Sequence, residues 1–356
     1  MRLTDKRKRR LKNILIAIAI ICITPLCEKG RMLCGIGASK VFAGKNLICV
    51  IDLGNGMYSP HGLEAGFHYE LMQQFAIDNN CNIRIISAKK GENYQDSLKN
   101  GRIDILITHK SDSLTGIRPS RQIDEGAIWA VKSSKDRELR QINNWISHTI
   151  LTGEYQKLKS RFNHRYDPIR YAETGRTTKT LSPYDDILKK YADELGWDWR
   201  MLAAVVYQES KFAINSHSYR GAQGLMQVMP RTGEYYGVDD LLDPETNISA
   251  GVSHLKRLQN LYRKESLGHD ELIKFTLATY NAGEGRIGDC RSLAAANQID
   301  STRWSEVIKV IPLMREDSIL ENPAVRHGKF HGLETMEYVE KIMEIYKAFC
   351  TICPQI

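Results

Sequence analysis

The chain has 356 residues, of which 42% are hydrophobic and 26% are charged, and its formal net charge is +8. This composition is typical of globular protein, and the length is sufficient for two domains that each bury a core. Residues 1–13 carry a net charge of +6, so the remainder of the chain is only about +2. Because the basic charge is concentrated at the start, it does not indicate nucleic-acid binding.

Residues 1–27 have the pattern of an export signal. Their basic start is followed by an apolar run from Ile14 to Leu26, which is typical of a signal-peptide core and short for a membrane span. Three outcomes stay open: cleavage after Val41-Phe42-Ala43, lipidation at Cys27 with an outer-membrane location, or an uncleaved membrane anchor. We therefore expect a signal peptide or N-terminal anchor over 1–27, and a location in the cell envelope on the periplasmic side.

The segment from residue 45 onward alternates between strand and helix patterns. Apolar, β-branched runs at 47–51, 83–86 and 103–107 predict buried strands, and the spacing of apolar residues predicts helices over 66–80 and 94–100. Alternation with short connections favours a parallel sheet.

Two stretches of this segment, Gly66–Leu71 and Leu98–Asp104, resemble the first lobe of a family-3 periplasmic solute-binding domain. The strand pattern at 128–132 and the helix patterns at 139–145 and 151–162 resemble the closing elements of that family. Only about 20 residues separate Ile107 from Ile128, which is too few for a second lobe. The resemblance therefore implies a truncated, one-lobe α/β solute-binding-like domain over 45–165, without the two-lobed cleft that binds a small solute.

Residues 166–181 are polar and aperiodic, which predicts a linker. The remainder, 182–353, has almost entirely helical patterns. Ser182 and Pro183 indicate a helix start, and Gly196 indicates the end of that first helix. Further helices are expected over 248–262, 271–280 and 334–349.

The most informative helix of this half contains Glu209. Asp198 is suited to cap the helix, and Leu202, Val206 and Glu209 fall on one face with Val205. A carboxyl group at the end of a core-facing stripe loses solvation, which raises its pKa and suits it to general acid catalysis. An exposed glutamate that only favours solubility is the alternative from this stretch alone.

Four separated motifs follow in order: Glu209-Ser210, Gly221–Pro230, Ala278–Gly283 and Glu334–Val339. Together they resemble the catalytic domain of the soluble-type lytic transglycosylases, with Thr279 as a departure inside the third motif. The resemblance implies an all-α, lysozyme-like catalytic domain over 182–353, behind the α/β domain. It implies that Glu209 and Tyr338 are catalytic and that four residues bind sugar: Ser210, Gln227, Tyr280 and Asn281.

The same resemblance implies an exported enzyme that cleaves the MurNAc–GlcNAc β-1,4 bond of peptidoglycan without water and leaves 1,6-anhydro-MurNAc ends. The implied partners are glycan strands, with no cofactor and no metal. A hydrolytic muramidase and a non-catalytic, glycan-binding envelope module stay open as alternatives. Gly283–Gly288 spells a dinucleotide fingerprint, but it follows a predicted helix instead of a strand. The cysteines allow a Cys290 bridge to Cys350 or Cys353, a C-terminal redox pair, or buried thiols.

Overall fold

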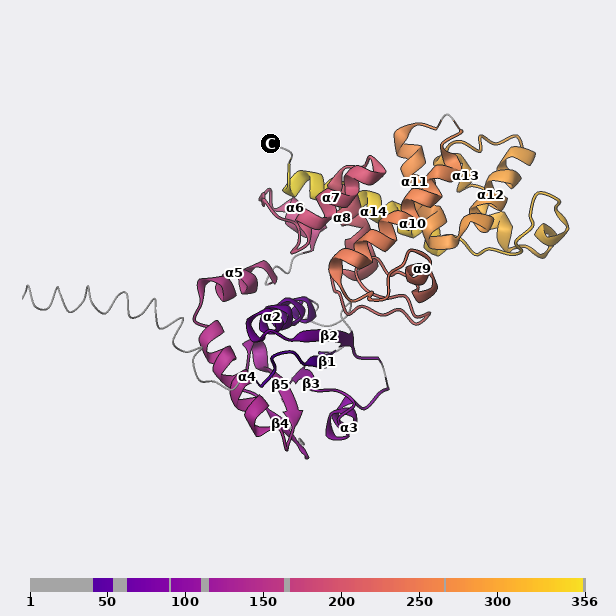
Figure 1. The fold of residues 1–356 in the computed structure, drawn as a ribbon. Helices are drawn as coiled ribbons and strands as arrows, with labels where there is room; N and C mark the ends of the chain where they lie inside the picture. Colours follow the sequence, from indigo (N-terminus) through magenta and orange to yellow (C-terminus); the bar gives the residue numbers. More distant parts are fainter. Residues whose placement is uncertain are drawn as a thin grey trace, which may run out of the picture.

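The computed structural model describes residues 41–53, 63–89, 91–109, 115–162, 167–265 and 267–354. An α/β domain built around one sheet lies beside a larger helical domain (Figure 1). Within the described residues, no helix is both long enough and apolar enough to cross a membrane. The predicted leader, 1–27, lies outside the described residues.

The strands of the described residues form one five-stranded sheet in the order β2-β1-β3-β5-β4. They are β1 (Asn46–Asp52), β2 (Asn82–Ser87), β3 (Ile105–His109), β4 (Ile117–Pro119) and β5 (Ala127–Lys132). β1 pairs with β2 and β3 in parallel, whereas β5 runs antiparallel to both β3 and β4. The expectation of a parallel sheet is therefore wrong for its second half. Between β3 and β5 the described residues form only β4 and the 3-10 turn η1 (Asp124–Gly126), with no crossover helix of the kind that parallel strands require.

Apolar side chains cover both faces of this sheet, because successive residues of a strand point to opposite sides. On β1, Cys49 and Ile51 join one buried cluster while Val50 joins the other. The first face packs against α2 (Glu64–Asn79), α4 (Asp136–Thr149) and α5 (Gly153–Phe162), and the second against α3 (Tyr94–Lys99). These helices confirm the predicted ones to within a few residues.

The predicted linker contains a short helix, α6 (Pro168–Glu173), which corrects the expectation of an aperiodic segment. The Asp167 carboxylate accepts hydrogen bonds from the backbone N–H groups of Ile169 and Arg170, and Pro168 occupies the first turn. α6 packs against the C-terminal helix α14 (Leu333–Ile352). This part of the chain is therefore attached to the helical domain.

From residue 185 the regular elements of the described residues are helices, which confirms the all-α part of the prediction. Besides α14 they are α7 (Asp185–Leu195), α8 (Trp199–Ser210), α9 (Pro230–Tyr235), α10 (Pro244–Tyr262), α11 (His269–Ala282), α12 (Glu284–Ala296) and α13 (Trp304–Val307), with the 3-10 turns η2 (Ile311–Arg315) and η3 (Asp317–Glu321). α7 begins three residues later than Ser182, because the Asp185 carboxylate accepts hydrogen bonds from the N–H groups of Leu181 and Ser182. Gly196 ends α7 in the left-handed conformation, as predicted.

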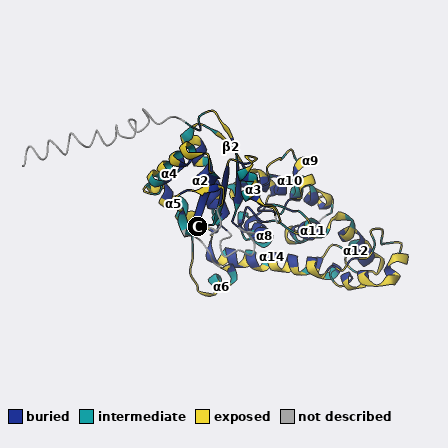
Figure 2. Ribbon diagram, turned by 90° about the horizontal axis from the view of Figure 1, so that it is seen from below, coloured by how far each residue is buried: buried dark blue, intermediate teal, exposed yellow. Residues whose placement is uncertain are grey.

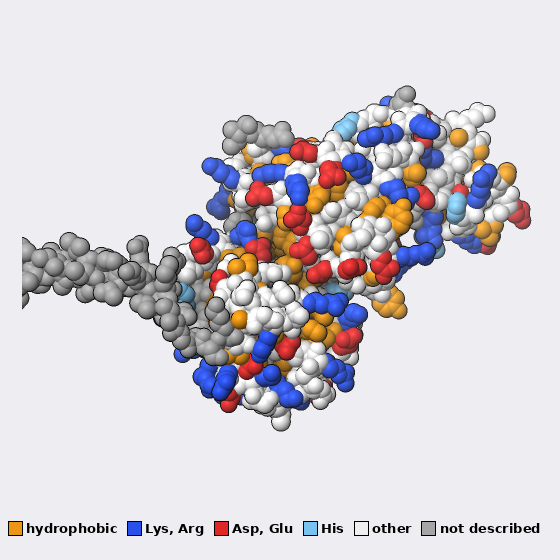
Figure 3. Space-filling view, in the orientation of Figure 1, with side chains coloured by type: hydrophobic (Ala, Val, Ile, Leu, Met, Phe, Trp, Pro, Cys, Tyr) orange, Lys and Arg blue, Asp and Glu red, His pale blue; other side chains and the backbone are white. Residues whose placement is uncertain are grey.

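α14 runs along one side of the helical domain, with α6 near one end and α12 toward the other (Figure 2). It packs against α8 and α11. The two domains also contact each other directly: the Tyr69 hydroxyl on α2 donates to Asp243 Oδ2 over 2.9 Å. Gly66 lets α2 approach Phe162 and Tyr184, which fill the space that a Cβ atom would need. Acidic and basic side chains are interspersed over both domains on the face seen in Figure 3.

Candidate active site

Glu209 lies in the last turn of α8. The Asp198 carboxylate caps this helix by accepting a hydrogen bond from the Arg200 N–H over 2.9 Å, as the sequence predicts. Leu202, Val205 and Val206 are completely buried, so the predicted core-facing stripe is confirmed. Glu209 continues that stripe to a partly exposed position, where the carboxyl group is sheltered and can still be reached from outside.

The Glu209 carboxyl group is paired with Tyr338, which lies on α14. The Tyr338 hydroxyl donates a hydrogen bond to Glu209 Oε1 over 2.5 Å. Burial raises the pKa of Glu209 from 4.5 to about 7, and the Tyr338 hydrogen bond opposes part of this rise. Burial and the nearby Glu209 charge hold the pKa of Tyr338 well above its usual value, so Tyr338 remains a donor.

Tyr280 stands beside this pair. It lies on α11, and its hydroxyl donates to the backbone carbonyl of Met226 over 2.7 Å. Burial, followed by the negative charge of Glu209, raises the pKa of Tyr280 well above its ordinary value. Helices α8, α11 and α14 therefore bring Glu209, Tyr280 and Tyr338 into one site from distant parts of the sequence.

Asn281 follows Tyr280 on α11 and is exposed. Its Oδ1 accepts a hydrogen bond from the Thr335 hydroxyl over 2.7 Å. Thr335 is buried near the start of α14, so the bond joins the third and fourth motifs. The Asn281 side chain is thus held at the edge of the site.

The other two predicted sugar-binding residues have roles inside the protein. Ser210 is completely buried, and its hydroxyl donates to the Val206 carbonyl over 3.1 Å within α8. This position faces away from any open surface, so the structure does not bring Ser210 to the exposed side of Glu209. Gln227 is partly exposed with a positive φ of 49°, and its Nε2 donates to the carbonyls of Gly224 and Ser216. These bonds fix the shape of the loop that carries it.

Asn247, in the first turns of α10, organises this loop and was not found by the sequence reasoning. Its Oδ1 accepts from the Met226 N–H over 2.9 Å, while its Nδ2 donates to the carbonyls of Gln223 and Leu241 over 3.0 and 2.8 Å. The side chain is completely buried. A polar residue among the apolar positions of a helix face was the available signal, since buried amides need hydrogen-bond partners.

Gly224 packs directly against Asn247. Its φ is +75°, and a Cβ atom would overlap with the Asn247 amide and with the Leu241 carbonyl. A glycine is therefore required here for two reasons, the backbone conformation and the close approach. Gly251 serves the other side of the loop, where Met226 occupies the space that a Cβ atom would need.

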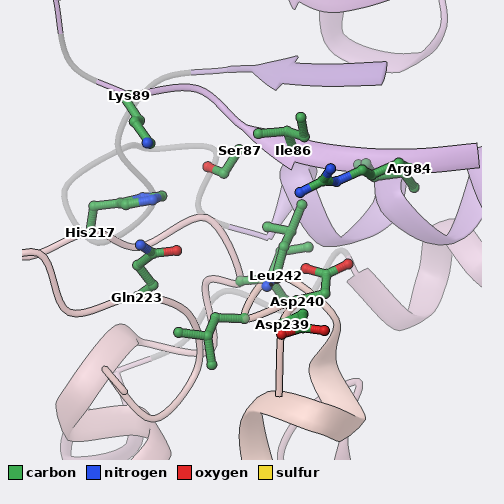
Figure 4. A pocket seen from close by; sticks show the side chains of 12 residues that line it. Arg84, Ile86, Ser87, Lys89, His217, Gln223, Asp239, Asp240 and Leu242 are labelled. Atoms are coloured by element: carbon green, nitrogen blue, oxygen red, sulfur yellow. Dashed lines mark hydrogen bonds between the residues drawn. The ribbon is translucent and has the colours of Figure 1, made fainter. Parts of the chain in front are cut away.

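A separate cavity of about 240 Å³ lies between the two domains. Figure 4 shows Arg84, Ser87 and Lys89 on the side of the sheet, and His217, Gln223 and Asp240 on the side of the helical domain. The carbonyl of Gln223 is one of the groups that Asn247 binds. The α/β domain thus reaches the same loop that carries the Met226 carbonyl to Tyr280.

Three remaining features of the sequence are the Gly283–Gly288 motif, His327 and the cysteines. Gly283 caps α12 immediately after α11, so the dinucleotide fingerprint lacks its strand. His327 pairs through Nδ1 with Asp289 Oδ1 over 3.1 Å, and no three metal-binding side chains are grouped to hold an ion in the described part of the chain. The described cysteines are free thiols, and Cys290 and Cys353 are buried. The interpretation as buried thiols is therefore the one that the structure favours over a bridge.

Comparisons with known proteins place this geometry in context. Residues 186–302 match the family model described as the transglycosylase SLT domain. Membrane-bound lytic murein transglycosylase F of Desulfosudis oleivorans is 33% identical over 258 residues, which cover 69% of this chain and 56% of the relative. The protein of the same name from Pseudomonas fluorescens is 32% identical over 261 residues, covering 69% and 53%.

Among solved structures, the 70 kDa soluble lytic transglycosylase Slt70 of Escherichia coli is 25% identical, with a TM-score of 0.36 and coverage of 50% of this chain and 25% of that one. The chain spans about half the length of the first two curated relatives. The helical domain built around Glu209 therefore contains a transglycosylase SLT domain, in a chain similar to membrane-bound lytic murein transglycosylase F.

Proposed function

We propose that this chain is a peptidoglycan lytic transglycosylase whose reactive group is Glu209. The observation that carries the proposal is the hydrogen-bonded pair of Glu209 and Tyr338, in which burial raises the carboxyl pKa to about 7. A carboxyl group with this pKa can both give and take a proton near neutral pH. Tyr338 is the hydrogen-bond partner of this carboxyl group, which suits a mechanism in which a single group first donates a proton and then takes one back.

The first step is an acid-catalysed bond cleavage. Neutral Glu209 donates its proton to the glycosidic oxygen between MurNAc and GlcNAc, and the bond from C1 of MurNAc to that oxygen breaks. The departing GlcNAc keeps the proton as a 4-hydroxyl group, while positive charge develops at C1. Tyr338 then stabilises the newly formed Glu209 carboxylate by its hydrogen bond.

The second step closes a ring inside the substrate. The Glu209 carboxylate takes the proton of the MurNAc C6 hydroxyl as O6 forms a bond to C1. The product carries a 1,6-anhydro end, Glu209 is protonated again, and no water is consumed. A hydroxyl group tethered to the reacting sugar has a high effective concentration, which replaces an activated water molecule.

Tyr280 and Asn281 contribute positioning in this proposal. Tyr280 stands beside Glu209 and is anchored at Met226, and Asn281 is anchored at Thr335. Both side chains are therefore held in place before a glycan binds, which reduces the entropy lost on binding. Gln227 shapes the loop beneath them, and Ser210 supports the end of α8 from inside.

Mass spectrometry of muropeptides released from purified sacculi tests the proposal. We expect products lighter by one water than the corresponding reducing ends, and their loss in Glu209→Gln. Glu340→Gln, an exposed glutamate on α14, is the control that should keep the activity. Products with reducing ends would indicate a hydrolytic muramidase, and glycan binding without any release would indicate a non-catalytic module.

The location and the first domain are part of the same proposal. The basic, apolar leader and relatives named as membrane-bound support a place in the cell envelope, on the side that faces murein. The one-lobe α/β domain over 45–165 would position the catalytic domain, since Tyr69 binds Asp243 and the interdomain cavity borders Gln223.

A further inference from the structure

Two cysteines at the end of α14 take no part in the proposed reaction. Cys350 lies in the last turn of the helix and is partly exposed, whereas Cys353 caps the helix and is buried. Both are thiols in the structure, so the reduced state is the one described. The Cys353 N–H donates to the Phe349 carbonyl over 2.9 Å, which is the regular helical bond. Cys353 therefore follows Cys350 at helical spacing.

This spacing suits the two thiols to each other. Residues three positions apart on a helix have Cα atoms about 5 Å apart, within the range of about 4.4–6.8 Å that a disulfide needs. Cys353 has φ −129° and ψ 71°, outside the helical region, so no following helical turn constrains it. Cys290 is buried on α12, which lies toward the opposite end of α14 (Figure 2). Cys350 and Cys353 are therefore placed to react with each other rather than with Cys290.

A single arginine lies beside this pair of thiols. Arg200 Nη1 donates to the Cys353 carbonyl over 3.0 Å. Burial raises the pKa of both Cys350 and Cys353, and the Arg200 charge opposes this rise at both thiols, because a cation favours the thiolate. Both sulfur atoms therefore lie near the same cation, which stabilises a thiolate when one forms.

The last turn of α14 also holds two other parts of the helical domain. The Ile352 carbonyl accepts a hydrogen bond from the Thr178 N–H over 2.7 Å, which attaches the segment that follows α6. Arg200, bound to the Cys353 carbonyl, also donates through Nε to Asp198 Oδ1 over 3.0 Å. Asp198 is the residue that caps α8. The backbone of this turn is therefore an attachment point for the start of α8 and for the segment after α6.

We propose that Cys350 and Cys353 are a redox-modification site, at which a reversible disulfide fixes the last turn of α14 and the two attachments that this turn makes. The oxidant is an organic disulfide. The bridge restricts the unfolded chain, and in the folded chain it holds the two carbonyls that Thr178 and Arg200 bind. Oxidation therefore stabilises the helical domain. This inference does not depend on the proposed activity.

The disulfide forms by two thiol–disulfide exchanges. Cys350, the more exposed thiol, loses its proton, and its thiolate attacks one sulfur of the oxidant while the other sulfur leaves as a thiolate. The Cys353 thiolate then attacks Cys350 Sγ and displaces the second thiolate of the oxidant. Each departing thiolate takes up one proton, so the pair loses two electrons and two protons, and the oxidant becomes two thiols.

Mass spectrometry after treatment with oxidised glutathione tests this site. Trypsin cleaves after Lys347, and residues 348–356 contain Cys350 and Cys353 but no other cysteine, lysine or arginine. When the reduced full chain is incubated with oxidised glutathione and then alkylated, this peptide should lack both alkyl groups and be lighter than the dithiol form by two hydrogen atoms. Dithiothreitol should reverse the change. A peptide alkylated at both cysteines, a glutathione adduct that persists at Cys350, or a bridge to another cysteine would refute the inference.

Thermal unfolding supplies a second readout. The oxidised protein should melt about 4–8 °C above the reduced protein. Cys350→Ser and Cys353→Ala should each abolish this difference between oxidised and reduced samples, whatever their effect on the reduced protein. Cys81→Ser replaces a partly exposed cysteine of the α/β domain and is the matched control that should keep the difference. A bridged peptide without any difference in melting temperature would overturn the stabilising role of the disulfide.

Discussion

Replacing Tyr338 by Phe removes one hydrogen bond from the reactive carboxyl group and leaves the ring in place. The bond of 2.5 Å runs from the Tyr338 hydroxyl to Glu209 Oε1 and lowers the pKa of Glu209, against the larger effect of burial. A hydrogen bond to a charged group contributes about 1.5–3 kcal/mol. Since one pH unit corresponds to about 1.36 kcal/mol, its loss should raise the Glu209 pKa by about one to two pH units.

The direction of this pKa shift distinguishes the loss of the Tyr338 hydrogen bond from a general loss of activity. The reaction starts with protonated Glu209, so kcat/KM should decline above pH about 7 in the parent protein. In Tyr338→Phe the declining limb should move upward by about one to two pH units. The plateau should also fall, by roughly ten- to a thousandfold, because the carboxyl group loses its orienting donor, equivalent to ~1.5–4 kcal/mol.

The assay is the pH profile of kcat/KM for release of soluble muropeptides from sacculi. Tyr346→Phe is a matched control on the same helix, since the Tyr346 hydroxyl donates to Asp198 Oδ2 over 3.3 Å and makes no bond to Glu209. It should leave the declining limb near that of the parent protein. A limb that stays in place in Tyr338→Phe, or that moves equally in both variants, would refute the assignment of Tyr338 to Glu209.

Three further predictions follow from the same contacts. Burial raises the pKa of Glu209 from 4.5 to about 7, so the contribution of Glu209 to stability is fully present below pH 4.5 and is lost as pH rises through 7. In urea unfolding, Glu209→Gln should therefore be as stable as the parent protein below pH 4.5 and more stable above pH 7, by up to roughly 3 kcal/mol. Gly224→Ala should destabilise the fold by about 2–5 kcal/mol, because the new Cβ atom overlaps with Asn247 at a position of positive φ. Gly221 also has positive φ but has open space around it, so Gly221→Ala should cost only about 1–2 kcal/mol. Equal losses of stability in the two variants would argue against the overlap with Asn247. The full chain should show no thermal shift with free amino acids, because a one-lobe domain cannot enclose a small ligand, and a micromolar amino-acid ligand would contradict that view.

The local elements of this protein could be predicted because their pattern depends on neighbours in the sequence. The stripe of Leu202, Val205 and Val206 determined which face of α8 is buried, and Asp198 determined where the helix begins. The same periodicity identified β1, β2, α2 and α14 to within a few residues. In each case apolar residues recur at the helical or strand period, and burial of that face decides the conformation.

Strand direction and the shape of the linker depended on contacts that are distant in the sequence. The apolar pattern of β5 is the same for either orientation, and its antiparallel pairing with β3 follows from the absence of a crossover helix between them in the described residues. α6 consists of only six residues, which is too short to be stable alone. α6 is stabilised in this protein because it packs against α14.

The sequence identified some residues of the candidate site, and only the tertiary structure showed how they contact one another. The motif order pointed to Glu209, Tyr280, Asn281 and Tyr338 before any contact was known, and the burial of Glu209 could be inferred from its place on the stripe. Only the tertiary structure brings Tyr338 to Glu209 across 129 residues of sequence and turns Ser210 inward. It alone shows that Asn247 holds the loop. Such contacts are determined by how helices pack against one another, which a pattern along one helix does not encode.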